Sequence, residues 1–209
     1  TRLRVVTGVQ TCALPISSWP TDQIYPSTDR LRNFFLFHRS CLADPIQDTD
    51  GETINIPKLI HEAAATYQIN PTLLLGIMEA QSQAISRCPN TAVLAGLMGL
   101  DGPVTAREQI SSAASKLRAA WDALIVNGVS PNGWSAGEPK TTHDGVAVIP
   151  ANNTIALLFD YSPYVGSTWG GDLPDERGTQ AVFIALRDYH LEKLSFYQLE
   201  RLYLPVLIR

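Results

Sequence analysis

Four side chains that could do chemistry follow a nearly continuous apolar stretch in the first half of the sequence. Within INPTLLLGIMEAQSQAIS, residues 69–86, they are Glu79, Gln81, Ser82 and Gln83. A carboxylic acid with a raised pKa can protonate a leaving group, whereas a glutamine amide can donate a hydrogen bond but supplies no proton. Glu79 is therefore a candidate for acid–base catalysis. The other three are candidates for ligand binding, or they are simply the polar end of a buried helix.

The sequence lacks the patterns of several other kinds of site. No H-x-x-x-H spacing and no C-x-x-C pair occurs, so we expect no metal site. Neither a P-loop nor a G-x-G-x-x-G run is present, and we expect no cofactor. DTDG at residues 48–51 resembles part of a calcium loop. With Gly51 at the sixth loop position, however, the first and twelfth are Ile46 and Pro57, which lack the required oxygen ligands, so an aspartate-rich turn is favoured.

The bulk composition is that of one ordinary globular domain. The chain has 209 residues, of which 45% are hydrophobic and 17% charged, enough for a sizeable core. A net charge of −4 with scattered Lys and Arg gives no basic field, so no nucleic-acid partner is expected. No apolar run approaches the roughly 20 residues that a bilayer-spanning helix needs, so we expect no membrane span.

The two ends of the chain are set apart from the domain. TRLRVVTGVQTCALPIS reads like a sequencing-library adapter translated in frame, so residues 1–17 are excluded as a scar. We expect the native start, and any signal peptide in it, to be missing. The rest is interpreted as a lead-in at residues 18–26, a single domain at residues 27–200 and an apolar tail at residues 201–209.

Excluding that scar also removes Cys12 and leaves a pair of cysteines. Cys41 and Cys88 each lie where a predicted helix ends. In an oxidising compartment a bond between them would close a loop of about 48 residues and stabilise the fold by roughly 4 kcal/mol on a chain-entropy estimate. The alternative is two unconnected buried thiols.

Apolar periodicity predicts a mainly α-helical domain. Helical spacing is found at residues 27–42, 57–69, 70–86, 105–128, 151–163 and 179–196. Candidate N-caps of the first helix are Ser27, Thr28 and Asp29. Asn70 and Pro71 begin the third helix, which is apolar around most of its circumference and should lie at the centre, packed by the others. Turn formers at residues 129–150 predict a small hairpin or a long loop over the helices.

Three segments in order carry a family resemblance. They are YQINP with the helices on either side at residues 56–86, AGLMGLDGPVTAREQISSAASKLRAA at residues 95–120, and VIPANNTIALLFDYSPYVGSTWGG at residues 148–171. Together they resemble the lysozyme-like domains of the lytic transglycosylase and muramidase superfamily, over about residues 27–189. The third is similar to the family signature P-x-N-x-A-x-x-L-Y-x-Y-T-P, carried here by Pro150, Asn152, Asn153, Ala156, Leu157, Tyr161, Pro163 and Tyr164.

The resemblance implies an α+β lysozyme-like fold in which the catalytic acid has been replaced. In active relatives a glutamate ten residues beyond the motif proline protonates the glycosidic oxygen. Counting from Pro71, this position is Gln81. Glu79 is a poor substitute, because two residues along a helix turn a side chain by about 200°. Other carboxylates that could enter the groove are Asp101, Glu108, Glu138 and Asp144.

Aromatic and asparagine side chains around the third segment are the remaining candidates for a glycan groove. Sugar rings present apolar faces that stack on exposed aromatic rings. Trp134 and Trp169 are interpreted as stacking platforms, whereas Tyr161 and Tyr164 fit a platform or a core position equally well. The predicted substrate-binding set is Ser82, Gln83, Trp134, Asn152, Asn153, Tyr161, Tyr164 and Trp169.

The favoured interpretation is a secreted or envelope-associated pseudoenzyme that binds peptidoglycan, as in bacterial-type cell walls, or a related polysaccharide. The expected groove lies between the central helix and NNTIALLFDYSPY. One alternative is an active muramidase or lytic transglycosylase that uses a relocated carboxylate. The other is a structural module of a cell-surface assembly, with protein partners only.

Overall fold

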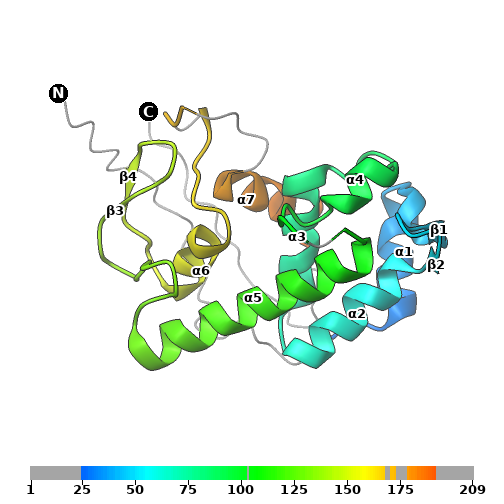
Figure 1. Ribbon diagram of the computed structural model, residues 1–209, viewed down its shortest axis with the longest axis horizontal. Helices are drawn as coiled ribbons and strands as arrows, with labels where there is room; N and C mark the ends of the chain where they lie inside the picture. The colour runs from blue at the N-terminus through cyan, green and yellow to red at the C-terminus, as the bar shows by residue number, and fades with distance from the viewer. Residues whose placement is uncertain (1–24, 103, 168–169, 173–177, 192–209) are drawn as a thin grey trace.

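The computed structural model describes residues 25–102, 104–167, 170–172 and 178–191 as a mainly α-helical fold with two small hairpins (Figure 1). The predicted scar and the C-terminal tail lie outside these residues. The α-helices are α1 (Thr28–Phe37), α2 (Ile56–Tyr67), α3 (Pro71–Ser82), α4 (Thr91–Ala95), α5 (Ala106–Asn127), α6 (Asn153–Tyr161) and α7 (Thr179–Asp188). The other elements are the 3-10 helix η2 (Cys41–Ala43) and the strands β1 (Ile46–Gln47), β2 (Thr53–Ile54), β3 (Lys140–Thr141) and β4 (Ala147–Val148).

Helix α3 forms the centre of the core. The Asn70 side chain caps it by accepting a hydrogen bond from a backbone N–H of the first turn, and Pro71 is its first residue. Residues 71–78 are all buried, and α7, α2 and α5 pack on the helix. Gly76 permits the close approach of α7, because a β-carbon there would lie 3.1 Å from Cδ2 of Leu186. The predicted central helix is thus confirmed.

The DTDG turn between β1 and β2 holds the start of α5. The Thr105 side chain accepts a hydrogen bond from the backbone N–H of Glu108, whose carboxylate accepts one from the Thr105 N–H. The buried carboxylate of Asp48 in the turn accepts a third, from the N–H of Ala106 at 2.8 Å. A negative side chain at a helix N-terminus is favourable. The aspartate of this turn therefore caps a helix.

Residues 129–150 contain the predicted hairpin. Strands β3 and β4 are antiparallel, with Lys140 opposite Val148. Asp144, in the turn between the strands, is 3% exposed, and its carboxylate accepts hydrogen bonds from backbone N–H groups, including that of Gly166 at 2.8 Å. This carboxylate attaches the hairpin to the chain that follows α6.

The predicted fold class is confirmed, since the described chain is mainly α-helical with small antiparallel hairpins. Ser27 is the candidate whose side chain caps α1. The hairpin β1–β2 and the short helix α4 were not predicted. Within the described residues, no helix is both long enough and apolar enough to cross a bilayer.

The predicted disulfide is also present. Cys41 in η2 is bonded to Cys88 in the loop after α3, with 5.6 Å between the two Cα atoms and a sequence separation of 47. The closed segment contains β1, β2, α2 and α3, so the bond joins the first helices to the end of the central one. The alternative of two separate thiols is therefore wrong.

Replacing both cysteines should lower the free energy of unfolding. For Cys41→Ser with Cys88→Ser we expect a loss of about 4 kcal/mol, because the unfolded chain regains the freedom that a closed loop of this length removes. Urea unfolding followed by circular dichroism measures the loss. Dithiothreitol should destabilise the wild-type protein and leave the double variant unchanged. Equal sensitivity of the two proteins to dithiothreitol would contradict the prediction.

Candidate functional site

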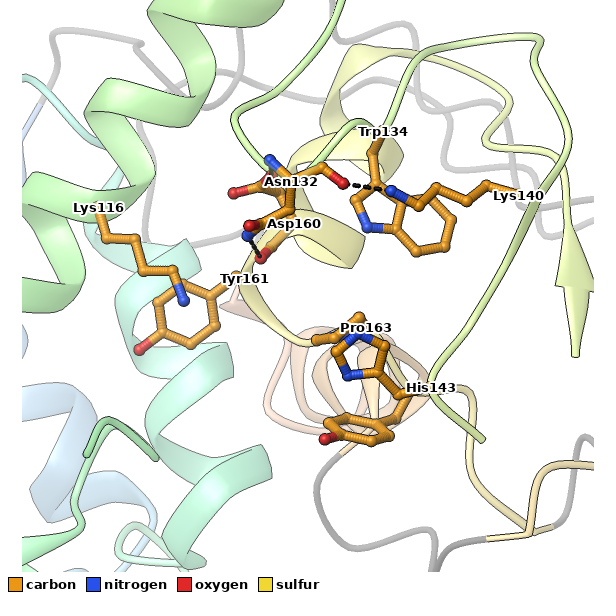
Figure 2. A pocket seen from close by; sticks show the side chains of 9 residues that line it. Lys116, Asn132, Trp134, Lys140, His143, Asp160, Tyr161 and Pro163 are labelled. Carbon is orange, nitrogen blue, oxygen red and sulfur yellow. Dashed lines mark hydrogen bonds between the residues drawn. The ribbon is translucent and has the colours of Figure 1, made fainter. Parts of the chain in front are cut away.

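A pocket with a volume of about 390 Å³ lies where α5, α6 and the hairpin β3–β4 meet (Figure 2). Two tyrosines, a tryptophan, a histidine, two lysines and a buried carboxylate give it both ring faces and charges. Its lining residues are Lys116, Asn132, Trp134, Lys140, His143, Asp160, Tyr161, Pro163 and Tyr164. The groove was predicted to lie between α3 and the segment that contains α6. In the structure, the C-terminal end of α6 forms one side of the pocket, and α5 and the hairpin β3–β4 form the other sides.

Two lysines reach the pocket from opposite sides in Figure 2. The ammonium group of Lys116, on α5, lies 5.0 Å from the ring centroid of Tyr161. That of Lys140, on β3, lies 5.0 Å from the ring centroid of Trp134 and donates a hydrogen bond to the carbonyl oxygen of Asn132. Both cations therefore lie over aromatic faces, an arrangement that is favourable for an ammonium group and keeps its long side chain in place.

A buried carboxylate fixes the loop that forms one end of the pocket. Asp160 is 2% exposed, and its Oδ1 accepts a hydrogen bond from the backbone N–H of Asn132 at 2.8 Å. The side-chain amide of Asn132 donates in return to the backbone oxygen of Asp160 at 3.1 Å. Ser130 Oγ accepts from the N–H of Trp134 at 2.9 Å and closes the loop. These bonds hold residues 130–134 on the C-terminal half of α6.

His143 and Tyr164 form the end of the pocket opposite the loop at residues 130–134. Their rings make an edge-on contact, with centroids 5.4 Å apart. The backbone N–H of His143 donates to the carbonyl oxygen of Pro163 at 2.8 Å, so the hairpin turn is attached directly to the chain after α6. The two rings are thereby positioned by backbone contacts as well as by packing.

The structure gathers three of the four predicted aromatic residues in this pocket. Trp134 is 2% exposed and stacks on Phe159 at 4.9 Å, so the prediction that it is an exposed platform is wrong. The loop hydrogen bonds at residues 130–134 turn its ring into the core, and only part of it borders the pocket. Tyr161 is also buried, whereas Tyr164 is partly exposed. Trp169 lies outside the described residues.

Tyr161 connects the pocket wall to the neighbourhood of α3. Its phenolic O–H donates a hydrogen bond to the carbonyl oxygen of Met98 at 2.7 Å. Burial raises the pKa of this phenol far above its ordinary value. The next residue, Gly99, has a φ of +70° and lies against Gln81, because a β-carbon there would collide with the side-chain amide. Tyr161 and Gln81 thus contact adjacent residues of one turn.

Sequence reasoning missed the residue that shapes this turn. Gln109 on α5 is fully buried, and its Oε1 accepts hydrogen bonds from the N–H groups of Met98 at 3.1 Å and Leu100 at 3.3 Å. Its Nε2 donates to the carbonyl oxygens of Ala95 at 2.8 Å and Leu100 at 2.7 Å. A lone glutamine in an amphipathic helix gives no sequence signal for such a role. Gln81 itself is partly exposed and is not among the residues that line the pocket.

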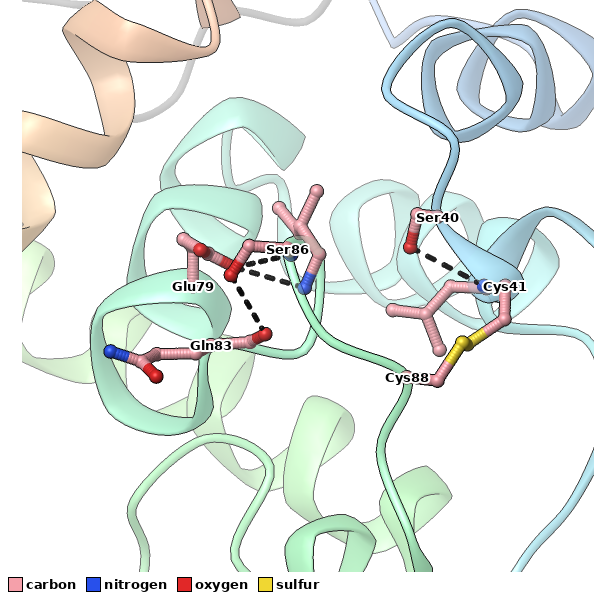
Figure 3. Close-up of a disulfide and its surroundings, with 8 residues drawn as sticks. Ser40, Cys41, Glu79, Gln83, Ser86 and Cys88 are labelled. Atoms are coloured by element: carbon pink, nitrogen blue, oxygen red, sulfur yellow. Dashed lines mark hydrogen bonds between the residues drawn. A yellow bond between two sulfur atoms is a disulfide. The ribbon is translucent and has the colours of Figure 1, made fainter.

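Glu79 holds the loop after α3 through hydrogen bonds from the backbone of that loop (Figure 3). Its Oε2 accepts hydrogen bonds from the N–H groups of Ile85 at 2.9 Å and Ser86 at 3.2 Å. Its Oε1 accepts one from the phenol of Tyr189 at 3.0 Å. Burial and the carboxylate of Glu79 raise the pKa of Tyr189. The contacts of Glu79 are those of a loop anchor.

The other polar residues at the end of α3 contact their own helix. The hydroxyl of Ser82 donates to the carbonyl oxygen of Met78 at 2.7 Å, and Gln83 is the left-handed residue that ends the helix. These contacts agree with the interpretation of a polar helix end. Asn152 caps α6 by accepting from the N–H of Ile155 at 3.0 Å, and Asn153 is the first residue of α6. None of these four predicted site residues lines the pocket.

The four carboxylates considered as relocated acids are dispersed. Asp101 and Glu138 are exposed, and Asp144 is buried under backbone N–H groups. Hydrogen bonds from the backbone of Val104 and Thr105 lower the pKa of Glu108, the opposite of what a general acid requires. Among the described residues, no group of three His, Cys, Asp or Glu is arranged to hold a metal ion.

Residues 133–137 read GWSAG and fit the G-x-S-x-G pattern of acyl-transfer enzymes. In such enzymes the serine lies on a sharp turn between a strand and a helix. Here the residues on both sides form turns, with neither a strand before Ser135 nor a helix directly after it. The run is therefore no nucleophile elbow.

A central part of the chain is similar to a known domain family. Residues 41–142 match the family model described as LasA, N-terminal domain. No curated protein and no solved structure matches the chain. The matched range is just under half of the chain. It begins at the disulfide, includes α3, Gly99 and α5, and ends before α6.

Removing the charge of Glu79 should destabilise the fold. Hydrogen bonds to a charged acceptor contribute about 1.5–3 kcal/mol, so we expect Glu79→Gln to lose about 2 kcal/mol of unfolding free energy in urea titrations. Glu62→Gln is the matched control, because Glu62 forms only a surface ion pair with Lys58 and should change stability by less than about 0.5 kcal/mol. Equal losses in the two variants would show that Glu79 is no anchor.

The buried phenol of Tyr161 should make the protein sensitive to alkali. Its pKa is raised in the folded state, so the unfolded state binds fewer protons above about pH 10, the ordinary tyrosine pKa. Stability should then be independent of this group below pH 10 and fall as the pH rises further. Urea unfolding of the wild type and Tyr161→Phe from pH 8 to pH 11 measures the effect. We expect a shallower decline in the variant; parallel curves would contradict it.

Proposed function

We propose that this chain is a lysozyme-like domain that binds peptidoglycan or a related polysaccharide and has lost the acid of the hydrolytic reaction. The observation that carries the proposal is the turn at Met98 and Gly99. Gln81, at the position where the family resemblance expects the acid, packs against Gly99, and Tyr161, a wall of the pocket, donates a hydrogen bond to the carbonyl oxygen of Met98.

The pocket is suited in size and chemistry to a sugar unit. Its volume of about 390 Å³ lies within the range of about 300–1,000 Å³ that is usual for small-molecule sites. Tyr164 and His143 offer partly exposed or exposed rings for the apolar face of a sugar. Asn132 and Lys140 offer polar groups for its hydroxyls. This combination of ring faces and hydrogen-bonding groups supports saccharide binding.

The loss of catalysis follows from the side chains at the end of α3. The amide of Gln81 can donate a hydrogen bond to a glycosidic oxygen but has no proton to transfer. Glu79, the nearest carboxylate in sequence, already accepts hydrogen bonds from Ile85, Ser86 and Tyr189. A binding function is therefore favoured over hydrolysis.

We infer a secreted or cell-envelope location for the protein. The bond between Cys41 and Cys88 is a feature of oxidising compartments, because cytosolic thiols are kept reduced. A wall polymer is also met only outside the cytoplasm. Both arguments support the same location.

Purified bacterial cell walls test this function. We expect the wild-type protein to sediment with the walls and to release no soluble muropeptides, and Gln81→Glu to sediment equally and to gain release, because a near-isosteric carboxyl group restores the proton donor. Sedimentation measured by gel and release measured by chromatography report the two properties separately.

The control variant is Gln81→Ala, which removes the amide without supplying an acid and should release nothing. Release by the wild type would favour an active enzyme with a relocated carboxylate. If the folded protein does not sediment with the walls, the function that remains is that of a structural module of a cell-surface assembly. A Gln81→Glu protein that folds, sediments and stays inactive would contradict the assignment of position 81 as the lost acid.

A further inference from the structure

The two halves of the disulfide differ in their exposure to solvent. Cys88, on the loop after α3, is exposed, whereas Cys41, in η2, is only partly exposed. Thiol–disulfide exchange begins when a thiolate attacks one sulfur of a disulfide, and access decides which sulfur is attacked. The sulfur atom of Cys88 is therefore the one that a thiolate from solution reaches, and the sulfur atom of Cys41 is the one that leaves.

The surface beside the disulfide carries unpaired cations, although the chain has a net charge of −4. Arg87 directly precedes Cys88, and Arg39 is exposed in the turn before η2. Neither arginine belongs to the ion pairs found in the described parts of the chain. The carboxylate of Asp44, at the end of η2, is paired with Arg32 at 2.9 Å, so its charge is offset. Cations beside a disulfide attract an anionic thiol and stabilise thiolates.

The segment that carries Cys88 is anchored by contacts other than the disulfide. The carboxylate of Glu79 accepts a hydrogen bond from the backbone N–H of Ile85 at 2.9 Å, and the side chain of Ile85 is 1% exposed (Figure 3). The N–H of Arg87 donates to the carbonyl oxygen of Gln83 at 2.9 Å. Opening of the disulfide leaves these contacts in place.

The segment that carries Cys41 is anchored in the same way. Leu42 and Ala43, which follow it in η2, are buried in the core. The Nε of Arg32 on α1 donates a hydrogen bond to the carbonyl oxygen of Ala43 at 3.1 Å. Because both segments are held by contacts that do not involve sulfur, the two sulfur atoms stay within reach of each other after the bond opens. The disulfide can thus open and close in the folded domain.

We propose that Cys88 is a site of reversible thiolation, at which a small anionic thiol of the glutathione class forms a mixed disulfide while the domain stays folded. The thiolate forms a bond to the sulfur of Cys88, and the bond between Cys88 and Cys41 breaks. The electron pair leaves with the sulfur of Cys41, which takes up a proton from water. Attack of the Cys41 thiolate on Cys88 reverses the step and releases the small thiol. No other oxidant or reductant is required, and glycan binding is not involved.

Exchange with reduced glutathione, stopped by acid, tests the proposal. The full chain with Cys12→Ser, which removes the third cysteine, is mixed with glutathione at about pH 8, and acid stops the exchange by protonating thiolates. Peptic digestion and mass spectrometry then locate the bound glutathione. We expect about tenfold more of it on Cys88 than on Cys41, because Cys88 is more accessible. Urea below the unfolding transition should leave the amount of adduct unchanged, because the folded domain reacts.

Variants identify the groups responsible. Arg87→Gln should lower the ratio of the glutathione adduct to the adduct of cysteamine, a cationic thiol, about threefold at low salt. Arg118→Gln is the matched control, because it removes the same charge from an ion pair on α5 and should leave this ratio unchanged. Glu79→Gln weakens the anchor of the Cys88 segment, so the disulfide should close more slowly and the adduct should rise about threefold. Thermal unfolding of each variant verifies that it folds.

Three results would overturn the proposal. Glutathione found mainly on Cys41, or equally on both cysteines, would contradict the assignment of Cys88. An adduct that increases with urea in parallel with the unfolded fraction would show that only the unfolded chain reacts. An Arg87→Gln protein with the wild-type ratio of the two adducts would contradict the selection of anionic thiols. Because these experiments use no cell walls, their outcome is independent of the test of glycan binding.

Discussion

The buried carboxamide of Gln109 joins the parts of the structure on which the site depends. It bonds with both its oxygen and its nitrogen to the turn at residues 95–100, and so fixes the backbone there relative to α5. Because the turn is held, Met98 presents its carbonyl oxygen to Tyr161 and Gly99 presents its bare backbone to Gln81. The three helices α3, α5 and α6 are thereby tied to one short piece of chain. An apolar residue at position 109 would leave several buried polar groups unpaired, each at considerable cost.

Buried carboxylates play a related part elsewhere. Asp48 attaches the β1–β2 hairpin to α5, Asp144 attaches the β3–β4 hairpin to the chain after α6, and Asp160 attaches the loop at residues 130–134 to α6. Each is at most 3% exposed and accepts at least one hydrogen bond from a backbone N–H group. Loops contain few apolar side chains, so a charged acceptor in contact with several amides is an effective means of docking them. The pocket owes its shape to two of these three contacts.

Local chemistry accounts for what could be predicted from the sequence. Ser27 and Asn70 cap helices through contacts with residues two or three positions away, and the continuous apolar run of α3 indicates that this helix is buried. The walls of the pocket could not be found in this way. Lys116, Asn132, Lys140 and Asp160 come from separate elements and form no spacing pattern. The burial of Trp134 likewise depends on how a loop docks on α6, which composition does not encode. The roles of Gln81 and of the asparagines as glycan ligands stay predictions.

The position of the disulfide links its formation to the folding of the helical core. Cys41 and Cys88 are neighbours only when α2 and α3 are in place, because both helices lie in the segment between them. Thiol oxidation therefore accompanies the assembly of the helical core, and an alkylating reagent applied during folding would label chains that have not yet assembled. The disulfide that stabilises the folded domain therefore also reports whether its helical core has assembled.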